Sequence, residues 1–184
     1  MHYSSSSKKA VTVTKRTVPA VVLSERSLFL LAIVRIFVGL LWFQQLAWKM
    51  PPGFGGLRRY VVSEAQHTFV PGYSLLLKQV FLANFSLLGA GVWIVELIVG
   101  MSLLFGLFTR LGALLALVLS VQLYVGLAYA PGEWYWTYGM LVLLSLVFVA
   151  LPAGRRLGLD ALLDHRLHTN PHMGRLARWF SWFV

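Results

Sequence analysis

The sequence predicts an all-α integral membrane protein, a four-helix bundle with a long outward first loop and an amphipathic C-terminal tail. Of its 184 residues, 58% are hydrophobic and only 12% are charged, whereas water-soluble domains are about one-quarter charged. A mean hydropathy of +0.73 agrees with this class. The net charge of +10 is then expected to anchor the chain at one face of a lipid bilayer rather than to bind nucleic acid.

Four stretches are apolar enough to cross a bilayer, because a hydrocarbon core of about 30 Å takes about 20 apolar residues in a helix. They run over 28–48, 85–106, 111–130 and 134–151. Short links join the second to the third and the third to the fourth, which predicts antiparallel neighbours. The connection at 49–84 opens with a run of Pro and Gly that cannot continue a helix, and it is predicted to be the long first loop.

Most of the 16 Lys and Arg residues lie in the two tails and in the short link after the second stretch. The positive-inside rule therefore predicts the cytoplasmic (inner) membrane, with both termini in the cytoplasm and the long loop outside. Aromatic residues such as Trp48 and Trp134 fall at the opposite ends of the stretches, where amphipathic rings prefer the headgroup level. A cleaved signal peptide is the alternative for the first stretch, but Arg35 within it and the lack of an A-x-A-like site favour a retained span.

This map divides the chain into three parts. Residues 1–24 form a flexible, basic cytoplasmic tail. Residues 25–163 form the domain of four transmembrane helices, and residues 164–184 form a basic and aromatic tail that is expected to lie in the membrane interface.

Two charged residues fall within the predicted spans, where each costs about 2.5–3.5 kcal/mol of insertion free energy. Arg35 shares a helix face with Trp42, and Glu96 shares one with Trp93. One interpretation is a catalytic node of Arg35 and Glu96 beneath a quinone pocket, with Glu96 exchanging a proton and the two Trp rings binding quinone. The alternative is an Arg35–Glu96 ion pair that only fixes the register of the two helices.

Basic residues gather on the outward side, which the positive-inside rule depletes of them. Lys49, Arg58, Arg59 and Tyr60 are predicted to bind a small inorganic anion through charge-assisted hydrogen bonds. The alternative is an amphipathic helix over 57–67 that rests on lipid headgroups.

Several kinds of site find no support. The chain contains no Cys, and its five His residues all lie outside the predicted spans. No metal, haem or nucleotide site is therefore predicted, and a quinone is the one redox-active ligand expected.

Short motifs appear in a distinctive order. Asn84 and Phe85 are followed by Glu96, then by LLFGLFTRLGA at 103–113 and AGRRLGLD at 153–160. Together they resemble the DoxX/DoxD family, over about residues 28–163. That family includes DoxD, the small subunit of thiosulfate:quinone oxidoreductase. The resemblance implies a four-helix membrane subunit that passes electrons from thiosulfate to quinone, giving tetrathionate, beside a DoxA-like partner.

Two functions remain open at this point, and with them whether the chain is part of an enzyme. The first is this DoxD-like subunit, with Arg35, Glu96, Trp42 and Trp93 at the quinone. The second is a non-catalytic accessory or scaffold subunit of a larger respiratory or photosynthetic membrane complex, which the two tails and the lack of cofactor ligands favour.

Overall fold

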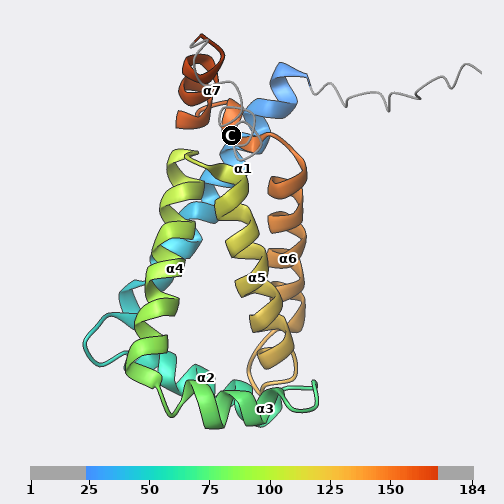
Figure 1. Cartoon of the computed structure of the whole chain (residues 1–184). Coiled ribbons are helices and arrows are strands. Elements are labelled where there is room, and N and C mark those ends of the chain that lie inside the picture. The colour runs from blue at the N-terminus through green and yellow to red at the C-terminus, as the bar shows by residue number, and fades with distance from the viewer. Residues whose placement is uncertain (1–23, 170–184) are drawn as a thin grey trace, which may run out of the picture.

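The computed structural model describes residues 24–169, and every regular element within them is a helix (Figure 1). The all-α prediction is confirmed for this part of the chain. The four longest helices are α1 (Glu25–Gln45), α4 (Phe85–Phe105), α5 (Thr109–Leu127) and α6 (Tyr135–Ala150). Three segments are long and apolar enough to span a membrane, namely Glu25–Lys49, Phe85–Phe105 and Thr109–Leu127. With 16 residues, α6 is apolar but shorter.

The long helices pack in chain order, α1 on α4, α4 on α5 and α5 on α6. Small residues let α1 and α4 approach closely, as they do in many membrane proteins. A Cβ atom on Gly39 would lie 2.6 Å from the backbone nitrogen of Leu104, and one on Gly100 would lie 3.3 Å from that of Phe43. These two contacts fix the register of the antiparallel pair.

The connection between α1 and α4 is largely helical, although its Pro and Gly residues predicted a loop. It contains η1 (Ala47–Lys49), α2 (Gly55–His67), α3 (Tyr73–Leu76) and the π-helical turn η2 (Leu77–Phe81). Figure 1 shows α2 and α3 lying across one end of the long helices. The amphipathic helix considered over 57–67 exists, but its apolar face, formed by Leu57, Val61 and Ala65, packs on the protein's own residues.

The opposite end of the bundle holds η3 (Ala153–Arg155) and α7 (Leu159–Thr169). An exposed ion pair joins Arg156 to Glu25 at the start of α1, with 2.5 Å between nitrogen and oxygen. The predicted boundary between 163 and 164 falls inside α7. The basic tail, apart from Ser24, and residues 170–184 of the amphipathic tail lie outside the described residues.

Candidate functional site

A cavity of about 640 Å³ is lined by residues of α1, α4, α5 and α6, together with residues of α2 and α3. Its wall is mainly Leu, Val, Phe and Trp side chains, into which a few polar groups project. These polar groups include the side chains of Trp42, Lys49, Glu64, Glu96, Gln122 and Tyr138. An apolar cavity of this size with a few convergent polar groups is typical of a site for a small organic molecule.

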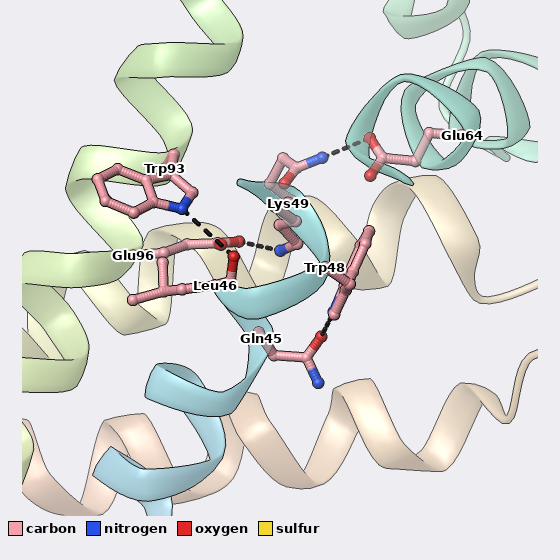
Figure 2. A network of polar contacts seen from close by, with 8 residues as sticks. Gln45, Leu46, Trp48, Lys49, Glu64, Trp93 and Glu96 are labelled. Carbon is pink, nitrogen blue, oxygen red and sulfur yellow. Dashed lines mark hydrogen bonds and ion pairs between the residues drawn. The ribbon is translucent and has the colours of Figure 1, made fainter. Parts of the chain in front are cut away.

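Lys49 and Glu96 form a buried ion pair in the wall of this cavity (Figure 2). The Lys49 ammonium donates to Oε1 of Glu96, and it also lies 4.7 Å from the ring centroid of Trp48. The predicted pairing of Arg35 with Glu96 is therefore wrong, because Glu96 pairs with Lys49. Because Gly39 lies against Leu104 and Gly100 against Phe43 in the antiparallel pair, the helix register brings the end of α1, not its middle, to Glu96.

Arg35 lies at the other end of the bundle and does not line the cavity. It is wholly buried, and its Nη2 donates to the carbonyl oxygen of Leu157 at 2.8 Å. The nearby carboxylate of Asp160 accepts hydrogen bonds from the backbone nitrogens of Phe108, at 2.7 Å, and Thr109, at 2.9 Å. Asp160 thereby satisfies free N–H groups at the start of α5, and Arg35 ties α1 to the same junction.

Of the two predicted quinone-binding Trp residues, one lines the cavity. Trp42 lines the cavity, whereas Trp93 does not, and its Nε1 donates to the carbonyl oxygen of Leu46 at 3.4 Å (Figure 2). Within the described part of the chain, Trp42 Nε1 and Glu96 Oε2 are both buried and have no hydrogen-bond partner. Two residues of the cavity wall thus carry a polar atom, one donor and one acceptor, that the protein leaves without a partner.

Glu64 of α2 is a site residue that the sequence did not single out. It is buried, it lines the cavity, and its Oε2 accepts a hydrogen bond of 2.5 Å from Nε2 of Gln122. The same nitrogen lies 3.0 Å from the hydroxyl of Tyr73. Burial raises the pKa of Glu64 to about 8, against the opposing influence of Lys49 and Gln122. The available signal was Gln122, the one side-chain amide in the apolar stretch 111–130.

The predicted anion-binding residues do not form one cluster. Lys49 and Tyr60 line the cavity, where the charge of Lys49 is balanced by Glu96. Arg58 and Arg59 are exposed. The guanidinium of Arg58 lies 5.4 Å from the ring centroid of Phe85, beside a separate hollow of about 320 Å³ at the start of α4.

A further set of polar side chains, Tyr60, Glu133 and Tyr138, lines one part of the cavity. Glu133, in the turn between α5 and α6, accepts a hydrogen bond of 2.6 Å from the Tyr138 hydroxyl. Partial burial and the charge of Glu133 raise the pKa of Tyr60, which lines the same cavity. The Tyr60 phenol therefore stays neutral at neutral pH and can donate a hydrogen bond, as the Tyr138 hydroxyl does to Glu133.

A family model described as "TQO small subunit DoxD" matches residues 68–177, which is more than half of the chain. The matched segment contains α3 to α7 and therefore Tyr73, Glu96 and Gln122 of the cavity. Trp42, Lys49 and Glu64 precede it. No curated protein and no solved structure is significantly similar to the chain.

Proposed function

The chain belongs to the DoxD family, and we propose that it is the membrane subunit of a thiosulfate:quinone oxidoreductase whose quinone binds in the cavity beside Trp42 and Glu96. In this reaction two thiosulfate ions each lose one electron and join through a new S–S bond to give tetrathionate. The quinone takes up the two electrons together with two protons and becomes a quinol.

The unused donor and acceptor in the cavity wall carry this proposal. A buried polar atom without a partner costs about 1–3 kcal/mol, so such atoms in a native protein call for an explanation. A quinone carbonyl would accept from Nε1 of Trp42, and the hydroxyl formed on reduction would donate to Oε2 of Glu96. The same two atoms thus suit both redox states of one ring.

The position of the cavity suits a ligand that is dissolved in lipid. Both α1 and α6 contribute to its wall, yet they are not among the pairs of elements that pack closely. On this side Leu41 is 52% exposed and Trp134 is 66% exposed. We propose that the quinone ring enters between α1 and α6 while its apolar tail stays in the bilayer.

The proposed function includes a placement in the membrane. We propose that the protein lies in the cytoplasmic (inner) membrane, with α6 as a fourth crossing. Both termini would then face the cytoplasm, and α2 would lie at the outer surface. The exposed rings of Trp134, Tyr135 and Trp136 at one end of α6 support this, because such rings prefer the headgroup level. Thiosulfate would then arrive from outside, drawn by the exposed charges of Arg58 and Arg59.

A partner subunit belongs to the proposal as well. The apolar wall of the cavity supplies groups for a quinone, but the described residues offer no comparably enclosed basic site for thiosulfate. We therefore propose that a DoxA-like subunit completes the anion site next to α2.

The test uses the full chain, purified from membranes with any partner that copurifies, and measures thiosulfate-dependent reduction of a short-chain ubiquinone. Trp42→Phe removes one donor and is expected to raise the KM for quinone about tenfold. Glu96→Gln is expected to lower kcat about 100-fold. The matched control is Trp136→Phe, an exposed ring outside the cavity, which should leave both constants unchanged.

Two results together would overturn this function in favour of the accessory subunit. The folded protein would reduce no quinone with thiosulfate, and it would copurify at fixed stoichiometry with a much larger assembly.

A further inference from the structure

Three buried basic or acidic side chains share the wall of the cavity, beside the half-buried Glu133 at its edge, and the charges of these three do not balance. Lys49 carries one positive charge, whereas Glu64 and Glu96 would carry two negative charges if both were ionised (Figure 2). A low-dielectric cavity disfavours an uncompensated charge, so one of the two carboxyl groups is expected to keep its proton. Lys49 donates directly to Glu96, while Glu64 receives its hydrogen bond from the neutral amide of Gln122. The retained proton therefore belongs to Glu64.

We propose, building on the function proposed above, that Glu64 is a catalytic residue that delivers one of the two protons to the quinone held in the cavity. When two electrons arrive from the sulfur anion, one ring oxygen becomes basic. The O–H bond of the Glu64 carboxyl group breaks, its proton bonds to that oxygen, and a carboxylate remains. The carboxylate is then reprotonated from water, and the second proton reaches the other ring oxygen from water by way of Lys49 and Glu96.

The surroundings of Glu64 are shaped to hold this carboxyl group in one place. Gln122 and Gly126 lie four residues apart and hence on one face of α5. Gln122 donates to Glu64, and a Cβ atom on Gly126 would come within 2.6 Å of Glu64 Cγ. The missing side chain at Gly126 thus makes the room that the carboxyl group needs to reach the cavity. The Gln122 amide and the Lys49 charge would also stabilise the carboxylate left after proton transfer.

Titratable groups from several elements line the cavity together with Glu64. They are Tyr60 on α2 itself, Lys49 from η1, Tyr73 from α3, Glu96 from α4, Glu133 from the turn between α5 and α6, and Tyr138 from α6. Burial raises the pKa of Tyr73 above its ordinary value, so this phenol stays neutral. Burial likewise holds the pKa of Glu64 at about 8, which keeps its carboxyl group protonated at pH 7.

The experiment compares the wild type with Glu64→Gln in the full chain and its copurified partners. The variant keeps a carbonyl that can accept from Gln122 but has no acidic proton. Binding of oxidised short-chain ubiquinone is expected to stay within about threefold, while thiosulfate-dependent reduction falls at least about 100-fold. Wild-type reduction should decline as the pH rises through about 8, and the residual activity of the variant should not follow this decline. Glu64→Asp, which restores an acid on a shorter side chain, should recover part of the rate.

Infrared spectroscopy of the same proteins gives a readout that does not depend on turnover. The carbonyl stretch of a protonated carboxyl group should disappear from the wild type as the pH rises through about 8, and it should be absent from Glu64→Gln. The control, Glu25→Gln, removes an exposed acid outside the cavity and should keep both the band and the rate.

The outcomes separate this inference from the proposed function. If the wild type binds and reduces quinone but Glu64→Gln does so equally fast with an unchanged pH profile, the role of Glu64 is refuted and the quinone site stands. If the wild type binds no quinone, the proposed function fails, and the infrared band alone would then show only a buried protonated acid.

Discussion

Lys49 and Glu96, 47 positions apart in the chain, form a buried ion pair that joins the end of α1 to α4 inside the bundle. Both side chains are buried, so an unpaired charge at either position would be costly, and both line the cavity. Its two members therefore belong both to the packing of the helices and to the proposed chemistry. Stability and activity measurements on the same variants can separate these two roles.

Replacing Lys49 alone should destabilise the protein strongly. Lys49→Met leaves the Glu96 carboxylate buried without its partner, and removing one member of a buried pair costs about 3–5 kcal/mol. The measurement is the free energy of unfolding in mixed micelles. The double variant Lys49→Met with Glu96→Leu should regain most of that loss, because an apolar pair of similar volume is often neutral. Equal stability of the wild type and the single variant would show that the pair does not form.

The junction around Arg35 should tolerate no added side chain. Gly106 has φ +62°, and a Cβ atom there would lie 1.9 Å from Nη1 of Arg35. Gly106→Ala is therefore expected to cost more than about 1 kcal/mol of unfolding free energy, from backbone strain and from displacement of the guanidinium. The matched control is Gly91→Ala in α4, where a Cβ atom meets open space. That substitution should be neutral or slightly stabilising, since Ala favours a helix over Gly. Two equal effects would contradict the buried position of Arg35.

The stability of the protein should depend on pH through Glu64. Burial raises the pKa of this group from its ordinary 4.5 to about 8 in the folded state. The folded state thus holds the proton more tightly, so the stabilisation is complete below about pH 4.5 and is lost as the pH rises through about 8. Relative to Glu64→Gln, the wild type should lose up to about 1.4 kcal/mol of unfolding free energy per pH unit in that window. Parallel curves for the two proteins would show that Glu64 is not buried as an acid.

The proposed placement in the membrane can be tested with single cysteines, because the chain has none of its own. Gly53→Cys and Pro131→Cys lie in exposed segments at the α2 end, and Leu162→Cys lies on an exposed position of α7. A membrane-impermeant maleimide added to intact cells should label the first two, and the third only after permeabilisation. Labelling of positions 131 and 162 from the same side would mean that α6 does not cross the bilayer. The cysteine-free parent shows the background.

Hydropathy was sufficient to locate the long helices. The stretch predicted at 85–106 corresponds to α4 at Phe85–Phe105, and the one at 111–130 to α5 at Thr109–Leu127. The resemblance based on 103–113 and 153–160 is confirmed by the family match, and the structure gives its physical basis. These two segments meet, since Asp160 of one accepts hydrogen bonds from Phe108 and Thr109 of the other.

The partners of the charged residues could not be predicted in the same way. A helical face indicates which residues point in one direction, such as Arg35 and Trp42 on the first apolar stretch. It says nothing of the register between two helices, which the close approach of Gly39 and Gly100 sets here. Glu64 escaped prediction for a similar reason. Its burial depends on α2 folding back over the end of the bundle, onto the space left by Gly126.

A quinone in the cavity between α1 and α6 can be detected by photolabelling the full chain with an azido-quinone and locating the modified residues by mass spectrometry. We expect attachment to the cavity segments around Trp42 and Tyr138, and loss of this labelling when excess ubiquinone competes. Labelling confined to exposed positions outside the cavity, such as Leu87 and Val118, and unaffected by ubiquinone would contradict it.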